Sequence, residues 1–390
     1  MLESKEETAV KVLILHVPYE HRGGEDVHVD MLVSAYREIG LETALYPAHR
    51  APQGISPIAA AKSLLPGAVA PEIEKFIQNS NADFVHLHNA FPLLGPNFFR
   101  WALKAKIKLI MTVHNHRFYC TNGLALRDGK VCKDCFGASV PWRPLAYNCN
   151  GDLKKSAYHA LALGEMNAQD LYRRAVSHFI APSPYIKNEL LKWGADPSRV
   201  SVLMNPVTED KASPSKQVLD VFYAGRLSSE KGIENLLRVV GSAPDLKFGI
   251  AGNGPLSALV SETALKLENL FYFPEMSHAE VLGQIQNSRI GILPSICNEI
   301  LPTFVLENFY HGKICIVPDL ESTRWLSESP WLGVKTDTSD VKAMLSKIRE
   351  ALSLPKSTQV TNLSEQLGEK KFRSGLKTLL GQNLPKMDIH

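Results

Sequence analysis

Short apolar runs alternate with helical patterns along most of the chain, and this alternation constrains the fold more than any other feature of the sequence. Residues 10–17 (VKVLILHV) are typical of a strand buried on both faces. Residues 27–39 then carry apolar side chains at every fourth position, and Gly40 is a helix stop signal. Strands that alternate with helices predict βαβ units and a parallel sheet.

A second alternating series follows the polar segment TEDKASPSKQ at residues 208–217, which is predicted to be a linker. The sequence therefore predicts an α/β protein with two domains of similar size. The N-terminal domain is expected over residues 1–210, with a cysteine-containing insert at 117–152. The C-terminal domain is expected over 211–360. A last helical segment over 361–390 is expected to cover one of the two domains, with packing back on the first domain as one alternative.

Three local patterns sharpen this prediction. One long helix is expected over residues 156–176 and another over 361–380. Ser277 and Glu280 have the spacing of a capping box that opens a helix. An Asp-Gly pair in NGLALRDGKV predicts a β-hairpin within the insert.

The bulk composition is that of a globular enzyme. Of 390 residues, 45% are apolar and 21% charged, and a net charge of only +3 argues against binding of nucleic acid. The N-terminal segment MLESKEETAV is acidic and polar, unlike a secretory signal, and no apolar run approaches the roughly 20 residues of a membrane-spanning helix. We therefore expect a cytoplasmic protein, with a position on the inner face of the membrane left open.

Two carboxylates, Glu299 and Glu307, flank an almost wholly apolar segment. Glu299 is expected in the loop after a strand, and Pro302 favours a helix that begins near Thr303. The free N–H groups at residues 304–306 would then form an anion site, bracketed by the two acids. The alternative is that both acids are ordinary solvated surface groups.

Two further strand-to-helix turns lie in the same half of the chain. In AGRLSSEKG, Arg226 and Lys231 are cations at a spacing that suits a diphosphate, although surface cations are common in loops. In AGNGP, Gly252 and Gly254 flank Asn253 and permit close approach of a ligand to the backbone. Three such turns at one edge of a sheet predict a ligand site better than any one of them.

In the first half, Gly23 and Gly24 lie between the first strand and the first helix, where a phosphate would meet the backbone. No GxGxxG and no GxxxxGK[ST] motif occurs, which disfavours hydride transfer and P-loop chemistry. His114 follows the strand LIMTV and is expected at the same edge of the sheet. The alternative for His114 is a histidine that only packs against its loop.

Taken together, these residues resemble the retaining, nucleotide-sugar-dependent glycosyltransferases of family 4. The resemblance implies the GT-B fold, in which two Rossmann-like α/β domains face each other across a cleft. The resemblance covers about residues 10–320, and its most specific element is the Glu-x7-Glu pair combined with the Arg and Lys of the preceding turn. The segments that carry it are RGGED, TVHNHRFYCTNGLALRDGKVCKDC, YAGRLSSEKG, AGNGP and EILPTFVLE.

The resemblance implies that Arg226 and Lys231 hold the donor diphosphate and that Glu307 binds the ribose hydroxyls. It also implies that Glu299 binds the transferred sugar and that His114 lies beside it at the reaction centre. Backbone contacts to the donor are expected at the remaining positions of the motifs, which are Gly23, Gly24, Gly252, Asn253, Leu301 and Thr303. The family usually has glycine where Leu301-Pro302-Thr303 stands.

The implied reaction moves a sugar from a nucleoside-diphosphate sugar to a glycan or lipid-linked acceptor, in the synthesis of a surface polysaccharide or glycolipid. A UDP-sugar is the first candidate for the donor and a GDP-sugar the second. No catalytic metal is expected, because the cations and the helix start can stabilise the leaving group. The alternatives are an epimerase or hydrolase that uses the same donor, or a non-catalytic protein that only binds it.

The insert contains four closely spaced cysteines, Cys120, Cys132, Cys135 and Cys149. This pattern fits a structural zinc site, with free thiols or a disulfide as the alternatives. The helix PNFFRWALKAKIK mixes Phe98, Phe99 and Trp101 with basic residues. It could rest on an anionic membrane, or it could cover the sheet with its lysines in water.

Overall fold

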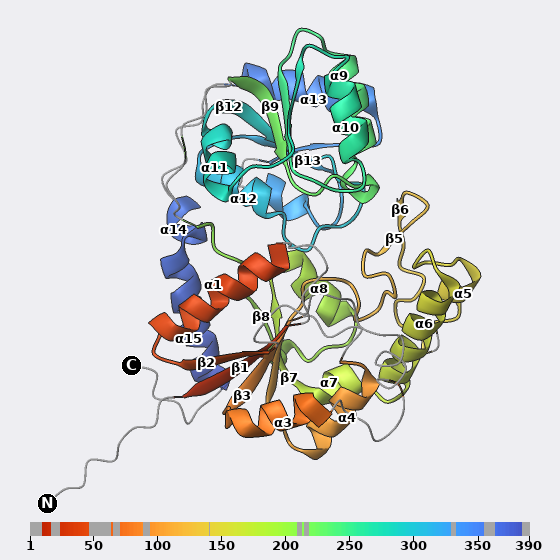
Figure 1. Cartoon of the computed structure of the whole chain (residues 1–390), viewed down its shortest axis with the longest axis vertical. Coiled ribbons are helices and arrows are strands. Elements are labelled where there is room, and N and C mark those ends of the chain that lie inside the picture. Colours follow the sequence, from red (N-terminus) through yellow and green to blue (C-terminus); the bar gives the residue numbers. More distant parts are fainter. Residues whose placement is uncertain are drawn as a thin grey trace, which may run out of the picture. The chain divides into compact units, whose positions relative to one another are not determined.

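The computed structural model describes residues 10–16, 24–46, 64, 71–88, 94–139, 141–208, 213, 218–328, 333–354 and 363–383. The chain divides into two compact units (Figure 1). The first comprises Met1–Leu124, Lys133–Leu203 and Arg373–His390, and the second comprises Ala125–Cys132 and Met204–Phe372. The predicted linker at 208–217 lies outside the described residues, except for Thr208 and Ser213.

The first unit is built on a parallel sheet of six strands in the order β2-β1-β3-β4-β7-β8. Its strands are β1 (Lys11–Leu15), β2 (Glu42–Tyr46), β3 (Phe84–Leu87), β4 (Leu109–Thr112), β7 (Val176–Ala181) and β8 (Val200–Val202). Every residue of β3 and β4 is buried, as expected of central strands covered on both faces. The pattern analysis missed β2, which is short, lies at the edge of the sheet and is mostly half-buried.

Seven described helices lie wholly within the first unit. They are α1 (Gly24–Glu38), α3 (Pro71–Ser80), α4 (Pro96–Lys104), α5 (Arg143–Ala146), α6 (Leu153–Ala168), α7 (Leu171–Ala175) and α8 (Pro184–Lys192), with a 3-10 turn η1 (Pro197–Arg199). The prediction of one helix over residues 156–176 was wrong. The helix ends at Ala168, and Asp170 takes a left-handed conformation with φ of 51°, so the chain turns before α7 begins.

The second unit contains a parallel sheet of six strands in the order β11-β10-β9-β12-β13-β14. Its strands are β9 (Leu219–Ala224), β10 (Phe248–Ala251), β11 (Leu270–Phe273), β12 (Ser288–Ile292), β13 (Cys315–Pro318) and β14 (Gly333–Thr336). The chain builds outward from β9 through β10 to β11, and then returns to the other side of β9 with β12. The neighbouring strands β9 and β12 therefore form the point at which the topology switches direction.

Two hydrophobic clusters lie on the two faces of the second sheet. One combines strand residues with α9 (Ile233–Gly241), α10 (Ser257–Ala264) and α13 (Val341–Ser353). The other combines them with α11 (His278–Gln286), α12 (Thr303–Tyr310) and α14 (Leu363–Leu367). Short 3-10 turns, η2 (Ser229–Lys231) and η3 (Arg324–Ser327), complete the unit.

The last predicted helix, over residues 361–380, is divided in the structure. Helix α14 ends at Leu367, and α15 (Glu369–Asn383) begins after Gly368. The interruption has a local cause, because the backbone at Gly368 forms a bridge with Val207 and Val207 N–H donates to Leu367 O at 2.8 Å. In the first unit, Arg373 of α15 forms an ion pair of 2.7 Å with Glu38 of α1.

Two local predictions are confirmed. The capping box is present, because Ser277 and Glu280 bond each other's backbone at the start of α11. The hairpin β5 (Leu126–Arg127) with β6 (Lys130–Val131) is also present. Its two turn residues, Asp128 and Gly129, have φ of 50° and 73°. A two-residue hairpin turn of type I′ requires positive φ at both positions.

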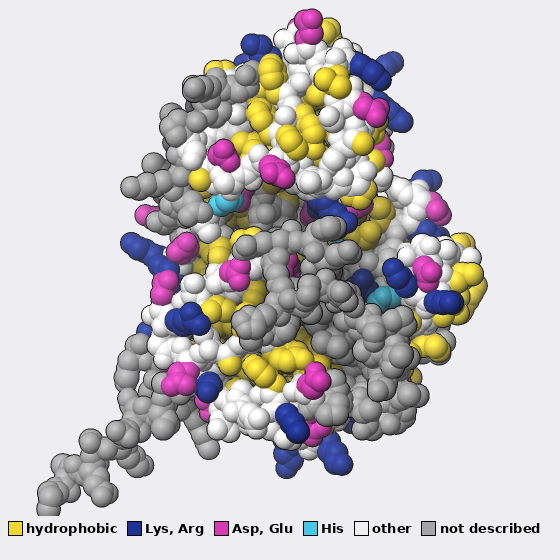
Figure 2. Space-filling model, in the orientation of Figure 1, with side chains coloured by type: hydrophobic (Ala, Val, Ile, Leu, Met, Phe, Trp, Pro, Cys, Tyr) yellow, Lys and Arg dark blue, Asp and Glu magenta, His cyan; other side chains and the backbone are white. Residues whose placement is uncertain are grey.

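Two of the three aromatic side chains of helix α4 belong to the core, and the third, Trp101, is half-buried. Phe98 and Phe99 are 2% and 0% exposed, and the Phe99 ring lies 4.8 Å from the ring of Tyr172 in α7. These buried rings favour the alternative of a helix that covers the protein core, and contact of this helix with a membrane stays a prediction. None of the described helices is both long enough and apolar enough to cross a bilayer. On the face shown in Figure 2, acidic and basic side chains are interspersed over both units.

Candidate functional site

The second unit brings three predicted site residues to the carboxyl edge of its sheet. Lys231 ends the 3-10 turn η2 after β9, Glu299 lies in the loop after β12, and Glu307 is on helix α12. Because β9 and β12 are neighbours at the topological switch, these segments meet at the position where open α/β sheets bind ligands.

A glycine allows the two segments to approach. Gly232 has φ of 68°, and a Cβ there would lie 2.0 Å from the carbonyl oxygen of Pro294. The N–H of Ile296 also donates to Glu230 O at 3.0 Å, so the loop after β12 is fastened to η2 by its backbone. This close contact fixes the position of Lys231 relative to the Glu299 loop.

Lys231 and Glu299 form a largely buried ion pair. The Lys231 ammonium donates to both carboxylate oxygens of Glu299, at 2.7 and 2.8 Å, and the two side chains are 26% and 9% exposed. Ser295 Oγ donates to the same carboxylate, and Ser322 Oγ accepts from the Glu299 N–H at 3.0 Å. Burial alone would lower the pKa of Lys231, but the Glu299 carboxylate raises it above its ordinary value, with smaller contributions from Cys297 and Tyr223. Lys231 is therefore a fixed cation.

Glu307 has a partner that the sequence analysis missed. The Nε2 atom of His278 lies 3.0 Å from Glu307 Oε1, and the Glu307 side chain is 14% exposed. His278 is the first residue of α11, and its Nδ1 lies 3.3 Å from the Thr208 hydroxyl. The capping box placed the start of that helix, but the contact with α12 depends on how the two helices pack.

The start of helix α12 differs from the expectation of free N–H groups at residues 304–306. The N–H groups of Val305 and Leu306 both bond to the carbonyl oxygen of Pro302, at 2.9 and 3.3 Å. Thr303 N–H bonds to Leu301 O at 3.0 Å. Most of the N–H groups expected to bind an anion are thus already hydrogen-bonded to backbone carbonyl oxygens. An anion at this helix start would rely more on side-chain cations.

The glycine-rich turn after β10 packs against the turn after β9. Gly252 has φ of 124°, and a Cβ at this position would lie 2.1 Å from the carbonyl oxygen of Gly225. The N–H of Leu227 also donates to Asn253 O at 3.0 Å. The chain's own backbone therefore explains the need for glycine at 252, while a ligand contact at Gly252 and Asn253 stays a prediction.

Arg226 is exposed and follows directly after these paired turns. Its carbonyl oxygen accepts a hydrogen bond of 3.0 Å from the Tyr223 hydroxyl. Within the described residues, no ion pair holds its guanidinium group. Arg226 is thus available for an anion, whereas Lys231 is already paired with Glu299.

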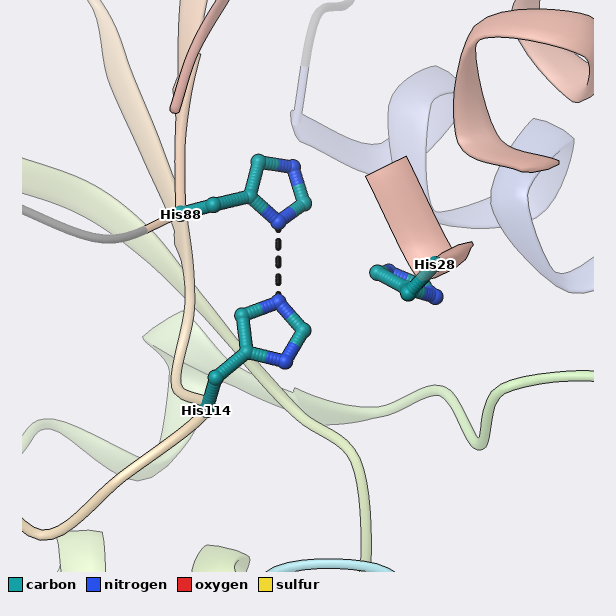
Figure 3. Close-up of side chains that lie close together, drawn as sticks. All are labelled: His28, His88 and His114. Atoms are coloured by element: carbon teal, nitrogen blue, oxygen red, sulfur yellow. Dashed lines mark hydrogen bonds between the residues drawn. The ribbon is translucent and has the colours of Figure 1, made fainter. Parts of the chain in front are cut away.

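The first unit gathers histidines at the carboxyl edge of its sheet. His16 follows β1, His88 follows β3, and His114 comes two residues after β4, three strands that are neighbours in the sheet. His28 comes from the first turns of α1 and lies beside His88 and His114 (Figure 3). The sequence analysis identified only His114. A histidine at the end of each of three neighbouring strands was the signal that could have found the others.

One hydrogen bond joins two of these imidazoles, and another joins His16 to an acid. His88 Nδ1 lies 2.8 Å from His114 Nε2 (Figure 3). On the other side of the group, His16 lies 3.1 Å from Asp26 and 3.4 Å from Glu25, both in the first turn of α1. The edge is therefore a continuous polar cluster that ends in two carboxylates.

Burial decides the charge of this cluster. Burial, together with the charge of His16, lowers the pKa of His28 to about 4. The pKa values of His88 and His114 lie well below the ordinary value, again through burial and the neighbouring imidazoles. His16 differs, because burial lowers its pKa but Glu25 and Asp26 outweigh that effect and raise it. At neutral pH, the three inner imidazoles are neutral.

Two other predictions, the donor contact at Gly23 and Gly24 and the zinc site in the cysteine insert, stay predictions. Gly24 is the first residue of α1, and Gly23 lies outside the described residues. The cysteines of the insert are half-buried. Among the described residues, the three-ligand group that could hold a metal consists of histidines rather than cysteines, and the zinc site at Cys120, Cys132, Cys135 and Cys149 stays a prediction.

Comparison with known families agrees with this architecture. The family model described as Glycosyltransferase Family 4 matches residues 22–211, and the one described as Glycosyl transferases group 1 matches residues 207–372. No curated protein matches the chain with significant sequence similarity.

Solved structures of glycosyltransferases share the fold at low sequence identity. Sucrose-phosphate synthase from Thermosynechococcus elongatus is 13% identical with a TM-score of 0.70, covering 97% of this chain and 100% of that one. HepE from Anabaena, in complex with UDP and glucose, is 14% identical with a TM-score of 0.67, covering 95% and 99%. The catalytic domain of starch synthase IV from Arabidopsis thaliana, bound to ADP and acarbose, is 11% identical with a TM-score of 0.64, covering 97% and 99%.

Proposed function

Because the chain belongs to the GT-B glycosyltransferases that these family models describe, we propose that it transfers a hexose from a nucleoside-diphosphate sugar with retention of the anomeric configuration. The acceptor is a hydroxyl of a glycan or a lipid-linked glycan, in the synthesis of a surface polysaccharide or glycolipid in the cytoplasm. UDP is the first candidate for the nucleotide, because the similar HepE structure holds UDP. ADP, which the starch synthase structure holds, and GDP are the others.

The observation that carries this proposal is the placement of Lys231, Glu299 and Glu307 at the topological switch of the second sheet. An ammonium group has three N–H donors, and Glu299 engages two of them. The third can bind a phosphate oxygen of the donor, and the exposed Arg226 can bind the diphosphate as a fork. The partly buried carboxylate of Glu307 can accept hydrogen bonds from ribose hydroxyls.

The proposed reaction breaks the bond between the anomeric carbon and the diphosphate oxygen, and forms a bond from that carbon to the acceptor oxygen. The electron pair of the broken bond leaves on the diphosphate, where Lys231 and Arg226 stabilise the new charge. The acceptor attacks from the face that the diphosphate leaves, and its proton passes to a phosphate oxygen. Glu299, held by Lys231 and Ser295, is positioned to bind a sugar hydroxyl. His114 is the proposed contact of the first unit with the sugar.

A thermal-shift screen with UDP, ADP, GDP and their sugar conjugates tests the donor site. A ligand that binds the native state must raise the melting temperature by mass action, and 100 Kd of ligand contributes about 2.7 kcal/mol. We expect one diphosphate to stabilise the wild type but not Glu307→Ala or Arg226→Ala.

Two exposed residues of the same unit provide matched controls. Glu262→Ala on α10 and Arg238→Ala on α9 remove the same charges away from the switch point and should keep the full nucleotide shift. If no nucleotide stabilises the wild type, or if the control variants lose the shift equally, the donor site is not where we place it.

The chemistry is tested with the nucleotide that passes this screen. NMR of the product should show the same anomeric configuration as the donor sugar. Rapid breakdown of the donor without transfer to any glycan acceptor would indicate a hydrolase or epimerase instead.

A further inference from the structure

The histidine cluster of the first unit contains a group with the geometry of metal ligands. One ligand nitrogen from each of His28, His88 and His114 lies within 4.8 Å of the others. The three side chains come from α1 and from the segments after β3 and β4, and they converge on one small space (Figure 3). Ligands from several rigid elements give a site that the fold itself holds in place.

The surroundings keep these imidazoles in the form that binds metals. His28 and His88 are 3% and 2% exposed, and His114 is half-buried. Burial lowers the pKa of each of them, so at neutral pH each ring is uncharged and has one unprotonated nitrogen, as a metal ligand requires. Within the described residues, Nε2 of His88 has no hydrogen-bond partner although it is buried. A buried polar atom of this kind is costly unless something binds it.

The nearby acids favour a cation. Glu25 and Asp26 contact His16, whose ring centroid lies 6.3 Å from that of His88. These carboxylates contact His16 and not the three proposed ligands, and their negative charges offset the charge of His16 beside the group.

We propose that His28, His88 and His114 bind one transition-metal ion, with Zn²⁺ as the first candidate, through three imidazole nitrogens. Zinc–nitrogen bonds of about 2.0–2.1 Å in a tetrahedron separate the ligand atoms by about 3.3 Å. The ligand nitrogens now lie within 4.8 Å of one another, so small adjustments of the three side chains bring them to this spacing. Three imidazoles leave the fourth position open for water or a substrate oxygen.

This site is distinct from the zinc site predicted in the cysteine insert, and its existence does not depend on the proposed function. One consequence does rest on that function. His114 is the proposed sugar contact, so a bound metal would compete with the sugar and inhibit transfer.

Cobalt spectroscopy of the full-length, metal-free protein separates the two sites. Co²⁺ bound by imidazoles gives only weak visible bands, whereas thiolate ligands add a strong near-ultraviolet charge-transfer band. In the variant Cys132→Ser/Cys135→Ser we expect one Co²⁺ per chain with visible bands and no thiolate band, which excess Zn²⁺ displaces. In that background, His28→Gln and His88→Gln should raise the Kd for Co²⁺ by at least about 100-fold.

His159→Gln is the matched control, because His159 is a partly buried histidine of the same unit outside the group, and it should bind Co²⁺ like its parent. Circular dichroism verifies that each variant is folded. Should the two buried histidines prove necessary for folding, the half-buried His114 allows the same measurement with His114→Gln. Folded His variants that keep the parent's affinity, or Co²⁺ bound only through thiolates, would overturn the proposal.

Discussion

The two units carry similar parallel sheets, yet the side chains beyond their carboxyl edges differ in charge. The second unit places Lys231, Glu299 and Glu307 there, with Lys231 kept charged by the Glu299 carboxylate. The first unit places imidazoles there, and burial keeps those of His88 and His114 neutral. The same backbone architecture therefore places a largely buried ion pair at one edge, and at the other a group of neutral imidazoles beside His16 and its two carboxylate partners.

This difference is what a transfer reaction between unlike partners requires. A diphosphate leaving group develops charge, and fixed cations in a preorganised setting stabilise it. A sugar hydroxyl is neutral, and neutral imidazoles can donate or accept a hydrogen bond without attracting a second phosphate. Variants that remove a charge at the edge of the second sheet should therefore change stability and nucleotide binding more than variants that replace a neutral histidine of the first unit.

The largest effect is expected for Lys231→Met. This change leaves the Glu299 carboxylate, which is 9% exposed, without its cation. Removing one partner of a buried ion pair costs about 3–5 kcal/mol, because the remaining charge is uncompensated. We expect a loss of this size in urea unfolding, together with loss of the nucleotide-induced thermal shift.

The double variant Lys231→Met/Glu299→Gln separates structure from binding. Without either charge, the protein should regain much of the lost stability but none of the nucleotide response. Lys347→Met is the control, because its ion pair with Glu350 is exposed and should contribute at most about 0.5 kcal/mol. A double variant that recovers nucleotide binding would show that Lys231 holds the loop and not the ligand.

The alternation of strands and helices was enough to predict two parallel-sheet α/β domains, and the paired glutamates and cations were expected at the correct strand ends. The pairing of Lys231 with Glu299, 68 residues apart, could not be predicted. It depends on the close contact of Gly232 with Pro294, which is a tertiary packing detail.

Other misses have similar physical causes. The break before α7 occurs at Asp170, which takes a left-handed conformation without a Gly or Pro to signal it. The neutral histidine group combines His28 from a helix with His88 and His114 from loops after strands. No local pattern links these three residues, because only the order of the strands in the sheet brings them together.

A smaller effect is expected for Gly252→Ala in the second unit. A Cβ there would lie 2.1 Å from Gly225 O, and the left-handed φ of 124° adds strain. We expect a loss of at least about 2 kcal/mol in unfolding free energy. Gly40→Ala in the first unit is the control, since it also has positive φ but no atom within 4 Å of the new Cβ, and should cost only about 1 kcal/mol. If Gly252→Ala weakened nucleotide binding without destabilising the protein, the ligand rather than the neighbouring turn would require this glycine.

The smallest effect concerns a neutral histidine away from the sheet edge. Burial, aided by the positive charges of Arg117 and Lys155, lowers the pKa of His159 to about 3. The unfolded chain takes up a proton at this residue below about pH 6.5, while the folded chain does not until about pH 3. His159 therefore reduces wild-type stability progressively as the pH falls through this window, by at most about 1.4 kcal/mol per pH unit.

His159 is partly exposed, so we expect it to lower the unfolding free energy of the wild type by roughly 1 kcal/mol between pH 7 and pH 5. His159→Gln should lose that much less stability than the wild type in urea unfolding over this range. Their difference should be constant between pH 7 and pH 8, where the residue is neutral in both states. An equal pH dependence of the two proteins would mean that His159 has the same pKa in the folded and the unfolded chain, and so that its surroundings do not keep it neutral.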